Sequence, residues 1–408
     1  MRIIYHHRTR STDAQRIHIR EIVDALAARG HEVAIVSLIP IDAGECDATR
    51  DAGEASWKTY IRKIPFAYEL AQLGYNLVGV PLLLWSSLRR RTDIIYERYA
   101  LLNFAGLIVA RMRRIPLLLE VNSPFALEQA RDGDIRAVRL ARWSERYILN
   151  RADRVITVST PLARILERAG VSGSRIEVMF NGVCLDKFRP GAASPKLLSE
   201  FGLTGHLVIG FVGWFRNWHG LDLLLRAFHE GNLAACKAKL LLIGDGPVMP
   251  ELRSYVREHA LGDSVIFTGP VPHTEVPQYL DLIDIAVQPS ANEYCCPMKI
   301  LEYMALGKAI VAPRQENIEE LLLENGQLFK PGNAEGLSQA LLTLLRNPET
   351  TRERGLRSRR AVTEHQYLWS TNARRIEELS SAASKMRRLL KREVARAPRS
   401  NSLPNGGS

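Results

Sequence analysis

Apolar runs alternate with amphipathic helical patterns along almost the whole chain, and this alternation constrains the fold more than any other feature. In the first half, an apolar run at residues 2–7 precedes a helical pattern over about 13–29, and Gly30 separates that pattern from a second run at 32–38. Strands that alternate with helices in this way form βαβ units, because parallel strands need a crossover connection. Further apolar runs follow at 93–98, 116–121, 154–159 and 175–180. The first half is therefore predicted to be a parallel sheet covered by helices.

The same alternation starts again after a stretch rich in turn-forming residues at 181–196, which we interpret as a domain linker. Five apolar runs follow it, at 207–214, 239–246, 265–269, 284–290 and 309–312. A chain of 408 residues also exceeds the size at which one hydrophobic core usually keeps growing. We expect an α/β protein with two Rossmann-like domains, at 1–185 and 186–365, followed by a helix at 366–384 and a basic, disordered tail at 385–408.

The charge of the chain is concentrated at its end. The formal net charge is +11 at pH 7, and residues 385–408 alone contain seven Lys or Arg and one Glu. Such a segment can attract nucleic acid or anionic lipid, although a solvated, unstructured tail is the simpler interpretation. Because nothing elsewhere is typical of a nucleic-acid reader, we expect no nucleic-acid partner.

Cysteine usage and the N-terminal residues indicate a reducing compartment. The five cysteines are odd in number and lack metal-ligand spacing, so no metal site is predicted. The first residues, MRIIYHHRTR, lack the apolar region and cleavage site of a signal peptide. We therefore expect a cytoplasmic protein.

Residues 292–312 place a charged pair, Lys299 and Glu302, at the start of a helix between two buried strands. The unpaired N–H groups and the dipole at a helix start attract anions, and Lys299 would add a full positive charge. Glu302 lies on nearly the same face and could accept hydrogen bonds from sugar hydroxyl groups. These residue types indicate a site for a phosphate beside a ribose.

The positions of the glycines also indicate that the phosphate site belongs to the second half of the chain. The first strand is followed by RTRSTDAQR, which contains no glycine, so the dinucleotide fingerprint is absent there. In the second half, Gly213 and Gly244 follow apolar runs, where they allow the backbone to approach a phosphate closely. We therefore expect the phosphate-containing donor to bind the second half and the acceptor, the other substrate, to bind the first half.

Two segments suggest contact with a membrane. Residues 70–88 carry no charge and precede three arginines at 89–91, but internal polar residues and Pro81 argue against a membrane span. A core or crossover helix and an interfacial segment that dips into lipid both remain open. The segment 135–151 places arginines along one helix face beside two aromatic residues, which suits either an anionic membrane surface or a solvated basic face. These arginines are Arg136, Arg139, Arg142 and Arg146.

Four motifs follow one another in the second half: FVGWFRNWHG (211–220), LLIGDGPVMPEL (241–252), VIFTGPVP (265–272) and PSANEYCCPMKILEYMALGKAIVA (289–312). Through these motifs the chain resembles the family-4 retaining glycosyltransferases. The resemblance implies the GT-B fold, in which two Rossmann-like domains face a cleft. It also implies that YLWSTNARRIEEL (367–379) is a closing helix that crosses back to the first domain.

The resemblance further implies roles for individual residues of the donor site. Glu302 would hold the ribose, Gly213 would contact the diphosphate, and the backbone around Val271 would lie against the base. Pro297, Met298 and Lys299 would lie beside the donor phosphates, with Gly244 at the neighbouring strand end.

Two departures from the family pattern affect this site. The first glutamate of the family's paired-glutamate motif falls on Tyr294, with Glu293 one position away. The basic pair that usually clamps the diphosphate falls on Trp214 and His219, and Arg216 between them is the candidate to replace that charge. We expect Lys299, Arg216 and Glu293 to act in catalysis.

The first domain is expected to hold the acceptor. Arg98, Glu120 and Asn122 stand at strand ends that face the cleft, and Asn122 replaces a histidine found in many relatives. We also assign His18 to the acceptor side, with simple packing inside its helix as the alternative. No general base is assigned.

The resemblance implies a retaining, metal-independent, hexosyltransferase-type glycosyltransferase. It would use a nucleotide sugar as co-substrate, with no other cofactor, and a glycan or lipid-linked acceptor in exopolysaccharide biosynthesis, and it would be cytoplasmic with possible attachment to an anionic membrane surface. Two alternatives remain: a nucleotide-sugar epimerase of the same fold, and a non-catalytic partner in polysaccharide assembly.

Overall fold

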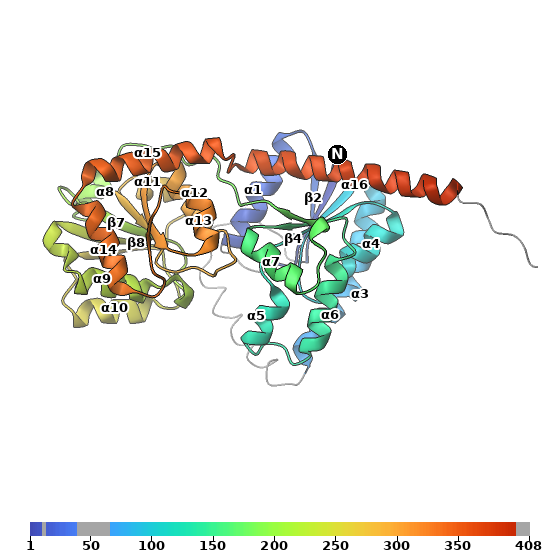
Figure 1. Cartoon of the computed structure of the whole chain (residues 1–408), viewed down its shortest axis with the longest axis horizontal. Helices are drawn as coiled ribbons and strands as arrows, with labels where there is room; N and C mark the ends of the chain where they lie inside the picture. Colours follow the sequence, from blue (N-terminus) through green and yellow to red (C-terminus); the bar gives the residue numbers. More distant parts are fainter. Residues whose placement is uncertain (10–13, 39–65, 397–408) are drawn as a thin grey trace, which may run out of the picture.

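The computed structural model describes residues 1–9, 14–38 and 66–396, which form two α/β domains, each built on a six-stranded sheet (Figure 1). Neighbouring strands run parallel in both sheets. Central strands such as β4, Leu117–Val121, are buried along their whole length, because helices cover both faces of a parallel sheet. The predicted fold class is confirmed.

The first sheet has the strand order β2-β1-β3-β4-β5-β6. Its strands are β1 Arg2–His6, β2 Glu32–Val36, β3 Ile94–Arg98, β4 Leu117–Val121, β5 Arg154–Thr157 and β6 Ile176–Val178. Its helices are α1 Ala14–Ala28, α3 Ala67–Arg89, α4 Ala105–Arg113, α5 Phe125–Arg131, α6 Val138–Leu149 and α7 Thr160–Arg168, with a 3₁₀ turn, η1, at Gly173–Arg175. Residues 39–65, between β2 and α3, lie outside the described residues.

The second sheet has the order β12-β11-β10-β7-β8-β9. Its strands are β7 Leu207–Val212, β8 Ala238–Ile243, β9 Val265–Gly269, β10 Ile285–Val287, β11 Ala309–Pro313 and β12 Gln327–Phe329. The surrounding helices are α8 Pro195–Glu200, α9 Leu221–Glu230, α10 Met249–Glu258, α11 Val276–Leu280, α12 Met298–Ala305, α13 Glu316–Leu322, α14 Ala334–Leu345 and α15 Pro348–Glu364, with 3₁₀ turns η2 at Asn217–His219 and η3 at Leu233–Cys236.

The last helix, α16 Trp369–Arg396, leaves the second domain and lies along the first (Figure 1). Trp369 and Ile376 are buried in one cluster with Tyr5 of β1 and Ile22 of α1, so α16 completes the core of the first domain. The predicted crossing helix is confirmed, but it is longer than expected. The sequence analysis placed a disordered tail from residue 385 onward, whereas the helix continues to Arg396, and residues 397–408 lie outside the described part of the chain. The underestimate arose because the basic composition of 385–396 hid its helical pattern.

The two chain segments that join the domains lie side by side where they cross from one domain to the other. The N–H of Val183 donates to the carbonyl oxygen of Tyr367 at 3.0 Å, and Val183 also pairs with Leu368 as an isolated parallel bridge. A Cβ atom on Gly182 would overlap the backbone of Leu368 and Trp369, so only glycine lets the segments approach this closely.

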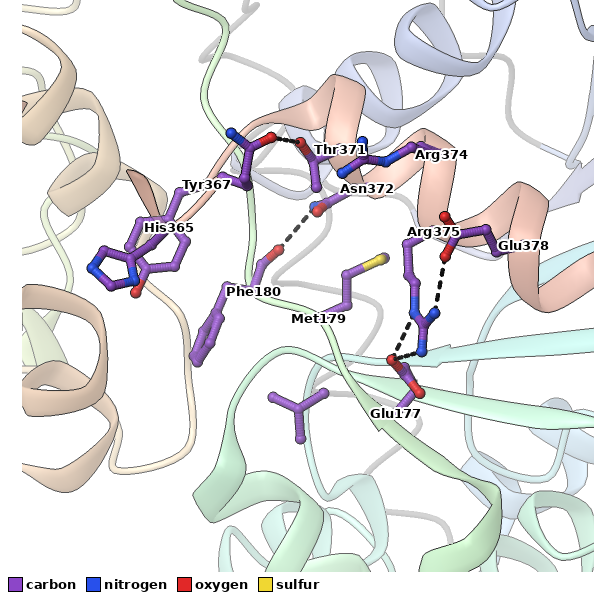
Figure 2. Close-up of a pocket in the computed structure, with 12 residues that line it drawn as sticks. Glu177, Met179, Phe180, His365, Tyr367, Thr371, Asn372, Arg374, Arg375 and Glu378 are labelled. Atoms are coloured by element: carbon purple, nitrogen blue, oxygen red, sulfur yellow. Dashed lines mark hydrogen bonds and ion pairs between the residues drawn. The ribbon is translucent and has the colours of Figure 1, made fainter. Parts of the chain in front are cut away.

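A pocket of about 230 Å³ opens beside this crossing, and its lining anchors α16 to the first domain (Figure 2). Asn372 donates its amide to the carbonyl oxygen of Phe180 at 2.8 Å. Arg375 donates to Glu177 through Nε at 2.8 Å and to Glu378 through Nη1 at 2.9 Å. The start of α16 is therefore fixed to the first domain on one side of the crossing.

Candidate active site

The ends of β7 and β8 bring two glycine backbones into contact. Gly213, directly after β7, has a φ of +146°, and its N–H donates to the carbonyl oxygen of Ile243 at 3.0 Å. Gly244, directly after β8, has a φ of +127°, and a Cβ atom there would overlap the carbonyl oxygen of Gly213. Both positions require glycine and lie at the carboxyl edge of the sheet, where open α/β sheets bind ligands.

Lys299, the second residue of α12, brings an ammonium group to the same place. Its Nζ lies 4.0 Å from the centre of the Phe211 ring, and a Cβ atom on Gly213 would lie 2.8 Å from it. Burial lowers the pKa of Lys299 to about 7, although the charge of Glu302 acts in the opposite direction. The helix start and this amine together make a compact site of positive potential.

The loop after Gly213 carries His219 into contact with this lysine. Its Nε2 lies 3.5 Å from Nζ of Lys299. Burial lowers the pKa of His219 to about 2, and the charge of Lys299 acts in the same direction. His219 is therefore neutral at pH 7 and can accept a hydrogen bond from the ammonium group.

The other two residues assigned to this loop, Trp214 and Arg216, come before His219 in the chain. Arg216 is half-buried and places its guanidinium carbon 4.9 Å from the centre of the Trp218 ring. Trp214 is also half-buried, directly after Gly213.

Glu302, one helical turn after Lys299, faces a histidine that the sequence analysis did not name. Its Oε1 lies 3.6 Å from Nε2 of His273, in the loop after β9. Burial acts to lower the pKa of His273, but interaction with Glu302 outweighs it and leaves the pKa raised. His273 comes two residues after Val271, which is half-buried. That nearness to the position assigned to the base was the only signal in the sequence.

The residues just before α12 connect the donor side to the first domain. Pro297 precedes the helix in an extended conformation, and Met298 packs against the buried cluster of β1, α1 and α16. Glu293 is exposed, whereas Tyr294 is buried and donates its hydroxyl group to Glu128 of α5. The position of the family's first glutamate thus holds a tyrosine that points toward the opposite domain.

The four residues assigned to the acceptor side form one buried network. Nη1 of Arg98 lies 2.7 Å from Oε1 of Glu120 and 3.2 Å from Nδ1 of His18. Asn122 and Tyr96 also donate to Glu120, at 2.5 and 2.7 Å. Burial acts to raise the pKa of Glu120, but its interactions with His18 and Arg98 and the hydrogen bonds from Tyr96 and Asn122 leave it lowered. Burial lowers the pKa of His18 to about 4, so this ring is neutral at pH 7.

A second buried group in the first domain was missed by the sequence analysis. Nδ1 of His6 lies 2.6 Å from Oε2 of Glu97, and both side chains are fully buried. Nε2 of His6 lies 2.8 Å from the hydroxyl oxygen of Tyr75 in α3. Gly106 makes room for this carboxylate, because a Cβ atom there would overlap it. No spacing in the sequence joins residues 6, 75 and 97, because His6 and Glu97 meet through the pairing of β1 with β3 and Tyr75 comes from α3.

Metal ligands and membrane spans were also sought among the described residues. In that part of the chain, no three His, Cys, Asp or Glu side chains gather in a way that could hold a metal ion. None of its helices combines the length and the apolar character needed to cross a bilayer.

Comparison with known families assigns both halves of the chain. Residues 15–187 match the family described as Glycosyltransferase Family 4, and residues 206–347 match Glycosyl transferases group 1. The chain belongs to the family-4 glycosyltransferases. The recognition made from the sequence motifs is confirmed, and the prediction of a glycosyltransferase is confirmed at the level of the family.

The curated relatives of this family-4 glycosyltransferase carry the names of several different sugar transferases. It is 25% identical over 255 residues to an α-D-kanosaminyltransferase and 31% identical over 195 residues to a 2-deoxystreptamine glucosyltransferase, both of Streptomyces kanamyceticus. These matches cover 60% and 46% of this chain, but only 65% and 50% of the relatives. A lipopolysaccharide core biosynthesis mannosyltransferase, LpcC of Rhizobium leguminosarum bv. viciae, is 26% identical over 304 residues, which cover 70% of this chain and 80% of LpcC.

Solved structures share the fold of this family-4 glycosyltransferase at low sequence identity. Anabaena HepE in complex with UDP superposes with a TM-score of 0.71 at 20% identity, covering 94% of this chain and 100% of HepE. A glycosyltransferase of Rickettsia africae gives a TM-score of 0.72 at 16% identity, covering 94% of this chain and 98% of that protein. At these identities the likeness establishes the two-domain architecture alone.

Proposed function

We propose that this protein transfers a hexose-type sugar from a nucleotide-sugar donor to a glycan or lipid-linked acceptor in the assembly of a surface polysaccharide. The observation that carries the proposal is the convergence of Lys299, His219 and Gly213 at the start of α12. This arrangement offers a buried cation and exposed backbone to a diphosphate. Support comes from HepE, which was solved with UDP and with UDP-glucose, and from LpcC, whose name describes a mannosyltransferase of lipopolysaccharide core biosynthesis.

Sugar transfer mainly requires stabilisation of the leaving group. Transfer breaks the anomeric C–O bond, and negative charge grows on the departing diphosphate while positive charge spreads over the sugar ring. Lys299 and Arg216 would stabilise that negative charge, and the water-poor surroundings strengthen the interaction. We propose that these cations and the α12 helix start perform this task without a metal ion.

We further propose that transfer retains the anomeric configuration. In this scheme the departing phosphate takes the proton of the acceptor hydroxyl on the same face of the sugar, so no separate base is required. The acceptor hydroxyl would approach from the network around Glu120 and Arg98, which lies in the opposite domain. Glu302 would accept hydrogen bonds from the ribose, with His273 beside it.

A transfer assay with matched variants tests the function. Purified protein is incubated with radiolabelled UDP-glucose or GDP-mannose and bacterial lipid extract, and we expect label to enter the lipid or glycan fraction. Glu302→Ala should reduce this incorporation at least about tenfold through lost ribose contacts, whereas Glu324→Ala, at an exposed position, should leave it unchanged. Unchanged incorporation with Glu302→Ala would contradict the site, and no incorporation with the wild type would leave the role of a non-catalytic assembly partner.

The same assay without acceptor separates transfer from epimerisation. A nucleotide-sugar epimerase would convert the donor sugar into its epimer with no lipid present. Our proposal predicts an intact donor sugar or slow hydrolysis, as seen by chromatography of the recovered nucleotide sugar. Accumulation of the epimer would overturn the transferase assignment.

We also propose that the first domain docks on the anionic inner face of the cytoplasmic membrane. Five large apolar side chains of α3 are exposed, and Leu77 is 81% exposed. Trp143 of the neighbouring α6 is also exposed, among the exposed arginines that the sequence analysis identified. An apolar stripe flanked by Trp and Arg suits the lipid headgroup boundary. The five side chains are Leu70, Leu77, Val78, Trp85 and Leu88.

Flotation with liposomes tests this docking surface. Vesicles that contain phosphatidylglycerol should carry the wild-type protein upward at low salt, and Leu77→Glu should reduce the floated fraction several-fold. Leu356→Glu on α15 is the matched control, because Leu356 is 53% exposed on the other domain and should not affect flotation. Equal flotation of both variants, or none with wild type, would contradict the proposal.

A further inference from the structure

The loop that precedes α12 is held between the two domains by hydrogen bonds to the first. The hydroxyl group of Ser159 donates to the carbonyl oxygen of Tyr294 at 2.7 Å. The side-chain amide of Asn181 donates to the carbonyl oxygen of Cys296 at 2.7 Å. These two contacts fix the backbone on both sides of Cys295, only a few residues before Lys299. The loop that leads into the donor site thus takes its position from the opposite domain.

Within this loop, Tyr294 makes the side-chain contact that crosses the cleft. It is only 8% exposed, and its hydroxyl group donates to Oε1 of Glu128 in α5. The hydroxyl group of Ser123 donates to Oε2 of the same carboxylate. A carboxylate has about four acceptor positions, so each oxygen of Glu128 keeps one for a further donor. Two donors therefore orient Glu128 without saturating it.

Glu128 is joined to the loop that leads into the proposed phosphate site. Tyr294, which donates its hydroxyl group to this carboxylate, comes five residues before Lys299 in the chain. A carboxylate from the first domain is thus held against the loop that leads to the ammonium group of the second.

We propose that Glu128 is a specificity-determining residue that accepts hydrogen bonds from hydroxyl groups of the transferred sugar, with Tyr294 and Ser123 as positioning residues that orient it. This inference rests on the proposed function. Tyr294 stands where the family resemblance places a glutamate, and the neighbouring Glu293 is exposed. The acid that the site lacks in the second domain is supplied from α5 of the first. Glu128 can consequently bind the transferred sugar only when the two domains are in contact.

The role of Glu128 is tested by comparing the binding of a nucleoside diphosphate with the binding of the corresponding nucleotide sugar. Titration calorimetry measures UDP against UDP-glucose, and GDP against GDP-mannose, on the full-length wild type and on Glu128→Gln. The variant should weaken nucleotide-sugar binding about tenfold or more, because a charged acceptor is lost, and should leave the nucleoside diphosphate within about threefold. Retained diphosphate binding also shows that the variant is folded. Glu324→Gln is the control and should bind all ligands as wild type does.

Tyr294→Phe separates positioning from contact. It should weaken nucleotide-sugar binding by a smaller factor, about threefold to tenfold, and should add little in the Glu128→Gln background, because both changes act on one carboxylate. If Glu128→Gln weakened the binding of nucleoside diphosphate and of nucleotide sugar equally, Glu128 would be only a contact between the domains. If Glu128→Gln bound the nucleotide sugar as tightly as wild type does, the inference would also be overturned. If wild-type protein bound neither nucleotide pair, the proposed function itself would fail, and this inference with it.

Discussion

A Cβ atom on residue 213 would lie 2.8 Å from Nζ of Lys299, so Gly213 is the residue that leaves room for this ammonium group at the end of β7. Gly213→Ala should therefore displace the lysine and block the backbone approach to a phosphate. We expect nucleoside diphosphate affinity, measured by titration calorimetry, to fall about tenfold or more. Gly262→Ala is the control, since a Cβ atom there would meet no atom within 4 Å. Equal affinity in both variants would refute the assignment of Gly213.

Lys299 should take up a proton when the donor binds. Burial lowers its pKa to about 7 in the free protein, and a bound diphosphate raises that pKa by adding nearby negative charge. At about pH 8 the free amine is mostly neutral and the bound amine is charged, so binding should take up close to one proton. The observed enthalpy should then differ between two buffers of different ionisation enthalpy. Lys299→Met should lose this difference, and buffer-independent binding by wild type would contradict the prediction.

Glu120 should matter for stability far more than an exposed carboxylate does. Removing one charge from a buried pair leaves its partner uncompensated, and the Arg98 side chain is only 11% exposed. Glu120→Gln should lower the free energy of unfolding by about 3–5 kcal/mol, as measured by urea denaturation. Asp186→Asn, which breaks the exposed pair with Arg189, should cost less than about 1 kcal/mol. Similar losses in the two variants would show that the acceptor-side network is not a buried ion pair.

Gly182 should be intolerant of any side chain. A methyl group there would overlap the backbone of Leu368 and Trp369, where the two segments between the domains cross. Gly182→Ala should destabilise the protein by about 1–3 kcal/mol or more, because the segments must move apart. The melting temperature should fall clearly below that of Gly262→Ala. An unchanged melting temperature would mean that the crossing is looser than described.

Patterns within one element were predictable from the sequence. Alternating apolar runs gave the two parallel sheets, and the charged pair Lys299 and Glu302 followed from their spacing at one helix start. The acceptor-side residues were also expected together, because Arg98 and Asn122 end neighbouring parallel strands. The helix over 385–396 was not expected, because the many basic residues of this segment led us to predict a disordered tail.

Contacts between distant segments were not predictable, because no periodicity encodes them. Tyr294 and Glu128 meet across the cleft, 166 residues apart in the chain. His6 and Glu97 meet because β1 and β3 are neighbours in the sheet. In the same way, His273 meets Glu302 because the loop after β9 turns toward α12. Contacts of this kind become visible only in the folded chain.

Nucleotide binding by the Lys299 site is the central claim, and a thermal-shift titration tests it most directly. UDP, GDP, ADP and their hexose derivatives are titrated into wild type, Lys299→Met and Lys330→Met, the last at an exposed position. We predict that at least one nucleotide raises the melting temperature of wild type and Lys330→Met with dose, because binding stabilises by about 2.7 kcal/mol at 100 times the Kd. Lys299→Met should need about tenfold more ligand for the same rise. No shift with any nucleotide, or a Lys299→Met response equal to that of wild type, would contradict the account.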